Sequence, residues 1–268
     1  MKATLLKHSL AVAAITFAAA GSVYAGDFTT ISNNGARTPG STNNPATDPF
    51  FINDLPSSWT LKNSVTTDVY SPVAGSTSQI VGQFVDSFWY EASSNSYIIG
   101  TYFQLTNDDH GITEINSIVR SGFADATGDL SAAWTYASGI YSDAEAGYRL
   151  RDPSRSDYIA SYNAGTAGTG AYFDADKVAI RTDVSLGEDN PNSGLYLIKF
   201  SADNSIVEWT SNAVHIVQGA SSSEGGRIRQ DMFLSGFAVT MVPEAETYAM
   251  MIAGLALIGT IARRRRSV

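Results

Sequence analysis

The sequence contains no cysteine among its 268 residues. Disulfide bonds, thiolate zinc sites and cysteine nucleophiles are therefore excluded. Histidine is also scarce, and only His110 and His215 lie between the two specialised ends of the chain. The motifs H-E-x-x-H, G-x-S-x-G and G-x-x-x-x-G-K are absent, so the usual sequence signals of zinc proteases, α/β-hydrolases and P-loop proteins are missing. These absences predict a protein that is not an enzyme and uses no cofactor or bound metal.

Basic residues are outnumbered, 17 against 26 acidic ones, which gives a net charge of −9. Six of the basic residues but only two of the acidic ones belong to the end segments. The body over residues 26–242 therefore holds 11 basic and 24 acidic residues, a net charge of −13. A surface this acidic repels phosphate backbones, so nucleic acid is not expected as a partner. The charge favours solubility, with attraction of divalent cations as the alternative interpretation.

The amino-terminal segment has the three parts of an export signal. Lys2 and Lys7 form a positive region, and Leu10 to Ala20 is an uncharged apolar run of 11 residues. Val23-Tyr24-Ala25 then offers compact residues at the positions that a signal peptidase reads. The apolar run is too short to span a bilayer, which takes about 20 residues. Residues 1–25 are therefore predicted to be a helical signal peptide that is cleaved after Ala25.

The carboxy-terminal segment, residues 242–268, also has three parts in a fixed order. Val242-Pro243-Glu244 is followed by an apolar stretch from Thr247 to Ala262 and then by four arginines, Arg263, Arg264, Arg265 and Arg266. As a helix the 16 apolar residues would measure about 24 Å, enough to cross a locally thinned bilayer. The arginines would stop translocation and stay on the cytoplasmic side. This pattern predicts a single transmembrane helix that leaves the body outside the cytoplasm.

This order of Pro-Glu motif, short span and terminal arginine cluster resembles the PEP-CTERM sorting signal of Gram-negative bacteria that make extracellular polysaccharide. The runs Thr247 to Met251 and Ala253-Gly254-Leu255 fit the same family pattern, whereas Ala245 stands where a second proline is expected. The resemblance implies an exosortase-like membrane enzyme as a partner, which cuts near Pro243 and Glu244. An ordinary single-span tail anchor is the alternative.

The body is predicted to be all-β. Residues 26–56 are rich in Ser, Thr, Asn, Pro and Gly and are predicted to form a polar, flexible leader. From residue 57 to 241 short runs with a period of two recur between turn signals, which is typical of half-buried strands. The fold expected from this pattern is an antiparallel β-sandwich of the jelly-roll type. The predicted strand runs are Ile80–Tyr90, Tyr97–Leu105, Ile115–Val119, Ser131–Tyr141, Val178–Val184, Leu195–Phe200, Ile206–Trp209, Val214–Val217 and Phe233–Met241.

Few residues of the body suggest chemistry. His215 lies in an apolar strand-like run and is interpreted as solvent-facing or structurally satisfied. Oxygen-rich turns occur at Asn107 to His110, at Asp174 and Asp176, and at Glu188 to Asn190. Calcium takes oxygen ligands of this kind, but none of the turns has an EF-hand pattern, so each is interpreted as a polar turn.

The four tryptophans are interpreted mainly as core residues, with sugar stacking as the alternative: Trp59, Trp89, Trp134 and Trp209.

The two ends together predict an exported protein. It is expected to be anchored in the inner membrane first, and then to reach the cell surface or the medium. The favoured hypothesis for the body is a structural or adhesive role in an exopolysaccharide or biofilm layer, with exopolysaccharide as a candidate partner. Two alternatives remain open: a calcium-dependent carbohydrate-binding module, and a secreted hydrolase that works through paired carboxylates.

Overall fold

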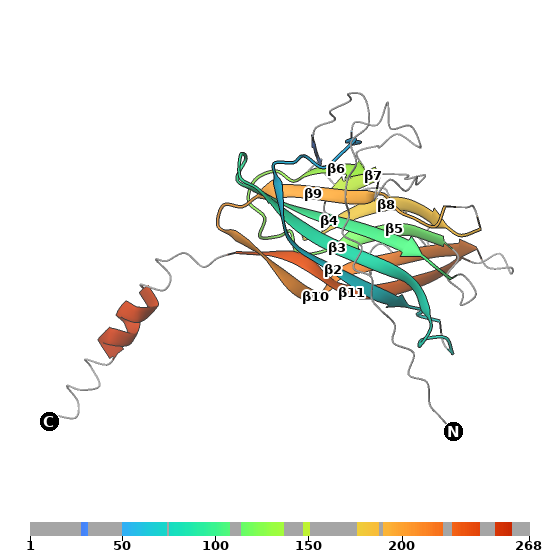
Figure 1. Cartoon of the computed structure of the whole chain (residues 1–268). Coiled ribbons are helices and arrows are strands. Elements are labelled where there is room, and N and C mark those ends of the chain that lie inside the picture. Colours follow the sequence, from blue (N-terminus) through green and yellow to red (C-terminus); the bar gives the residue numbers. More distant parts are fainter. Residues whose placement is uncertain are drawn as a thin grey trace, which may run out of the picture.

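The computed structural model describes residues 28–31, 50–73, 75–107, 114–136, 147–150, 176–187, 190–221, 227–241 and 250–258. Residues 250–258 form a helix, and the other regular elements of the described part are strands joined by turns (Figure 1). The predicted signal peptide, residues 1–25, lies outside the described residues. The strands are β1 (Thr29–Thr30), β2 (Trp59–Tyr70), β3 (Ile80–Glu91), β4 (Ser96–Leu105), β5 (Glu114–Arg120), β6 (Ser131–Thr135), β7 (Gly147–Leu150), β8 (Val178–Ser185), β9 (Leu195–Ser201), β10 (Ser205–Ser221) and β11 (Arg227–Met241).

The strands form two sheets, which Figure 1 shows as two layers. One sheet has the order β1-β6-β9-β4-β3-β2, and the other has the order β11-β10-β5-β8-β7. Each pairing between these strands is antiparallel. The prediction of an all-β antiparallel fold is confirmed. The strand order differs from that of the eight-stranded jelly roll, because β2, β3 and β4 are consecutive neighbours within one sheet.

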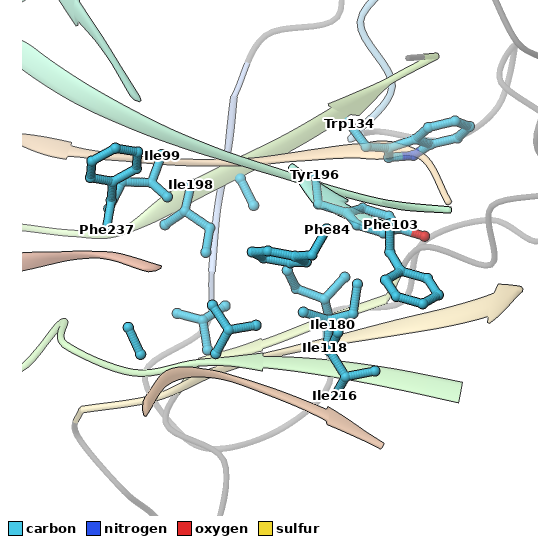
Figure 2. Close-up of a cluster of buried hydrophobic side chains, with 14 of the residues drawn as sticks. Phe84, Ile99, Phe103, Ile118, Trp134, Ile180, Tyr196, Ile198, Ile216 and Phe237 are labelled. Atoms are coloured by element: carbon cyan, nitrogen blue, oxygen red, sulfur yellow. The ribbon is translucent and has the colours of Figure 1, made fainter. Parts of the chain in front are cut away.

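The core lies between the two sheets and follows from the alternation of side chains along each strand. Every second residue of β3, β4 and β9 points toward β5, β8 and β10 of the other sheet. Burial of such a side chain stabilises the fold by about 1.5–3 kcal/mol. Figure 2 shows the large buried side chains that meet there, which include Phe84, Ile99, Phe103, Ile118, Ile180, Ile198 and Ile216.

Strand β2 is an edge of the six-stranded sheet, and the sequence pattern does not predict it. Its 12 residues are mostly exposed, and Val69 alone among them is buried. Residues 65–70 alternate between less and more exposed side chains, but the five residues before them, 60–64, are all exposed and show no alternation. The pairing with β3 shifts between Leu61 and Asn63. The bulge and the exposed Lys62 within it discourage another strand from pairing with this edge.

Part of the predicted flexible leader belongs to the folded body, which corrects the prediction for residues 26–56. Ile31 and Phe50 are buried in the main core, and β1 pairs with β6. Ile52 joins a second cluster on the other face of the six-stranded sheet, where it packs with Trp89 and Ile98. The polar composition of the segment as a whole hides these few apolar residues. Ile52, with Phe28 and Leu55 packed beside it, covers the large side chains on that face of the sheet.

Candidate functional site

The residues predicted for sorting and processing lie outside the described part of the chain. This applies to Val242, Pro243 and Glu244, to Arg263 through Arg266, and to the cleavage position Ala25. The structure does describe the strand that ends immediately before Val242 and a helix inside the tail. The candidate site is therefore built from these two elements.

The helix of the tail covers residues 250–258. Its nine residues are all apolar or glycine, so it has no polar face. The larger side chains, from Met250 to Ile258, are exposed. The predicted span from Thr247 to Ala262 extends beyond this helix on both sides. Within the described residues, no helix is both long enough and apolar enough to cross a membrane.

Strand β11 carries the tail, because it ends at Met241. It pairs with β10 up to its last residue, where Met241 lies opposite Ser205. The Met241 side chain is 48% exposed. The pairing of β10 with β11 shifts between Thr210 and Val214, and Asn212 in this bulge has a left-handed backbone, with φ of 57°. Beyond the bulge, β10 pairs with β5. Near the end of β11, Val239 is hydrogen-bonded to Gly122, which follows β5.

A buried ion pair joins the two sheets at this point. Asp86 of β3 and Arg120 of β5 are both completely buried, and their Oδ1 and Nη1 atoms are 2.7 Å apart. Asp86 also accepts hydrogen bonds from the Thr101 hydroxyl at 3.2 Å and from the Phe237 N–H at 2.7 Å. Arg120 Nη2 donates to the Phe237 carbonyl. The pair therefore contacts both backbone polar groups of one residue of β11.

The electrostatics of this pair reflect its burial. Burial raises the pKa of Asp86 above its ordinary value of 3.8, and the charge and hydrogen bond of Arg120 oppose this increase. The Nε atom of Arg120 is buried with no hydrogen-bond partner. A buried polar group that is not satisfied costs about 1–3 kcal/mol. The arginine is therefore held at an energetic cost, and its removal or the removal of Asp86 would leave the other charge unpaired.

Gly122 forms a second attachment for β11. The N–H of Val239 donates to the Gly122 carbonyl at 2.9 Å. Gly122 has a left-handed backbone with φ of 93°, and a Cβ atom there would clash with Ala238. The Gly122 N–H in turn donates to Asp176 Oδ1 at 3.0 Å. We call Asp86, Arg120, Gly122 and Asp176 the β11 clasp, because they fasten the strand within five residues of the tail.

Comparison with known families identifies the segment that follows the clasp. Residues 242–266 match the family model described as the PEP-CTERM protein-sorting motif. The tail is a PEP-CTERM sorting domain. A tail of this family implies an exported protein that an exosortase-like membrane enzyme processes, through a membrane-anchored intermediate that precedes release at the surface. The match confirms the resemblance inferred from Val242, Pro243, Glu244 and the terminal arginines. No curated protein and no solved structure matches the chain.

Ahead of the PEP-CTERM domain, His215 is a partnered side chain on β10. Its Nε2 atom lies 2.5 Å from Asp231 Oδ1 on β11. Its ring stacks on the Phe233 ring, with centroids 4.4 Å apart and an interplanar angle of 7°. The histidine therefore fits the interpretation as a structurally satisfied residue, and it cross-links the two strands of the hairpin that carries the tail.

The oxygen-rich turns are described only in part. Asp176 uses Oδ1 to accept hydrogen bonds from the backbone N–H groups of Gly122 and Ala124, which makes it a turn-stabilising residue. Asp108, Asp109, His110, Asp174, Glu188 and Asp189 lie outside the described residues. In the part of the chain that the structure describes, no group of three or more His, Asp or Glu side chains could hold a metal ion.

The tryptophans divide into core and surface residues. Trp134 and Trp89 are buried. Trp59 donates from Nε1 to Glu91 at 3.0 Å and packs against Phe28. Trp209 of β10 is 42% exposed and contacts the Phe237 ring edge-on, with centroids 5.0 Å apart. Among these four residues, Trp209 is the one whose ring offers a substantial surface to a ligand.

Sequence reasoning missed the β11 clasp. The available signal was the position of Asp86. It lies two residues from both Phe84 and Phe88, so the three side chains share the face of the strand that points into the core. A carboxylate at an inward position requires a buried partner. The sequence does not say which of the basic residues supplies it, because Arg120 is 34 residues away and lies on the other sheet.

Proposed function

We propose that this chain is a non-enzymatic, exported surface protein that is sorted through its PEP-CTERM tail and then serves a structural or adhesive role in an exopolysaccharide layer. One observation carries the proposal: a folded β body ends at Met241, and the sorting motif begins at the next residue. Before processing, the tail would hold the body at the outer side of the inner membrane. After processing, the body would be located at the cell surface or in the medium.

Sorting is tested by intact-mass analysis of the protein from fractionated cells and from the culture medium. The strain that has the exosortase-like enzyme is compared with its deletion strain. We expect the mature mass to lack the residues that follow the Pro243-Glu244 region only when the enzyme is present. A chain that retains its tail through Val268 in both strains would contradict the proposal and would indicate an ordinary membrane anchor.

The adhesive role is supported by Trp209, because an exposed indole ring can stack on the apolar face of a sugar. Its place on β10, next to the last strand, leaves the ring accessible in the processed protein. We expect the processed form to be retained on exopolysaccharide from the same cells and the Trp209→Ala variant to be retained less. The Leu61→Ala variant, which loses an exposed apolar side chain on β2, is the matched control.

Retention that does not change with Trp209→Ala would exclude this residue as the platform. Retention lost on chelation of calcium, and restored by its addition, would favour the calcium-dependent binding module instead. Turnover of a polysaccharide or ester substrate by the processed protein would contradict the non-enzymatic role.

A further inference from the structure

Very little chain separates the last residue that the clasp holds from the sorting motif. Val239 is held by Gly122, and Pro243 lies four residues further along the chain. Four residues of fully extended chain span at most about 14 Å. An enzyme that acts near the Pro243-Glu244 bond must therefore work close to the edge of the five-stranded sheet.

The distance to the tail helix is limited in the same way. Nine Cα–Cα steps separate Met241 from Met250, the first described residue of the tail helix. Their maximum span is about 32 Å, which is close to the thickness of a bilayer's hydrocarbon core. While the tail is held in the membrane, the body cannot move away from the surface on which the processing enzyme acts.

The clasp keeps the end of β11 attached to the body, so residues of this strand cannot lengthen the accessible segment before the sorting motif. Release of β11 from Phe237 to Met241 would add five residues to the accessible segment. That release requires the loss of the pairing of these residues with Ser205–Trp209 of β10. It also requires the loss of the Val239 bond to Gly122 and of both Phe237 bonds to the ion pair. It would also separate Asp86 and Arg120 from polar groups that they need in a buried setting. Fraying of the strand end is therefore opposed at two successive points.

We propose that the β11 clasp, which reinforces the pairing of the end of β11 with β10, limits the rate of tail processing, because the attached strand end keeps the cleavage motif a few residues from the folded body. This inference rests on the proposed sorting function and concerns the regulation of the same site. The partner that it constrains is the membrane enzyme, which must reach the motif within the space that the clasp leaves. Lengthening the chain between Met241 and Val242 should relieve the constraint without changing the motif or the fold.

The test uses the full chain in cells that have the processing enzyme. Six Gly and Ser residues are inserted after Met241, and pulse-chase labelling measures the rate at which the tail is lost. Six flexible residues add about 12–15 Å of average reach. We expect processing to become roughly three- to tenfold faster, equivalent to about 0.7–1.4 kcal/mol of steric work. The same six residues inserted after Gly75, whose surroundings are open, should leave the rate unchanged.

A second variant loosens the clasp without adding chain. Gly122→Ala introduces a Cβ atom that clashes with Ala238 at a left-handed backbone position, so the end of β11 should detach more readily. We expect faster processing together with faster amide hydrogen exchange at Val239. A normal rate in the wild type with no acceleration by the insertion would overturn the clasp proposal while leaving the sorting function intact. Absence of processing in the wild type would overturn both.

Discussion

Replacement of Asp86 by alanine should strongly destabilise the body. The carboxylate is fully buried and accepts hydrogen bonds from Arg120, Thr101 and Phe237, so its loss leaves a buried guanidinium without a counter-charge. Breaking a buried ion pair from one side costs about 3–5 kcal/mol. Each kcal/mol lowers the melting temperature of a domain of this size by about 2–4 °C, so a decrease of roughly 6–20 °C is expected. Urea denaturation and thermal unfolding of the mature protein measure the effect.

The matched control is Asp68→Ala on β2. This carboxylate accepts one exposed hydrogen bond from Gln83, and its loss should change the free energy of unfolding by less than about 0.5 kcal/mol. The double variant Asp86→Leu, Arg120→Met removes both charges but still leaves the polar groups of Phe237 without these partners. It should therefore remain destabilised. A decrease of less than about 1 kcal/mol for Asp86→Ala would refute the assignment of the pair as a buried attachment of β11.

Three further predictions concern other parts of the body. Gly100→Ala should destabilise the fold by about 1–3 kcal/mol, because a Cβ atom would lie 2.5 Å from the Trp89 ring; thermal unfolding measures the loss. Burial tends to raise the pKa of Glu91, but the hydrogen bonds from Lys199 and other donors outweigh it and lower the pKa below 4.5. The stability from Glu91 is therefore present above pH 4.5 and lost as the pH falls through the folded-state pKa, so Glu91→Gln should flatten this part of the pH profile of unfolding. Phe50→Ala should cost about 3–5 kcal/mol, since the ring is completely buried in the main core.

Each of these variants has a control in the same chain. Gly187→Ala has space for a Cβ atom, with the nearest atom 3.8 Å away, and should be tolerated. Glu208→Gln removes an exposed carboxylate from β10 and should keep the acid-dependent slope that Glu91→Gln loses. Leu61→Ala removes an exposed side chain and should cost much less than Phe50→Ala. Equal losses for Phe50→Ala and Leu61→Ala would mean that the segment around Phe50 does not belong to the core.

The sorting motif can be read from the sequence itself. A sorting signal is a contiguous segment, so it does not depend on which distant residues the fold brings together. The order of Val242-Pro243-Glu244, the apolar stretch and the arginines is therefore sufficient, and the family match agrees with it. The all-β class is also encoded locally, because the period-two pattern of β4 or β8 depends only on which residues alternate.

What the tertiary structure alone decided is which distant residues meet. The first half of β2 shows no alternation because its residues 60–64 are all exposed. The leader prediction for residues 26–56 did not foresee that Ile31 and Phe50 are buried once the sheets form. The β11 clasp brings together Asp86, the segment with Arg120 and Gly122, and Asp176, which come from three places in the chain. Their partnership depends on strand order and register, which arise from long-range packing. Local sequence patterns do not contain that information.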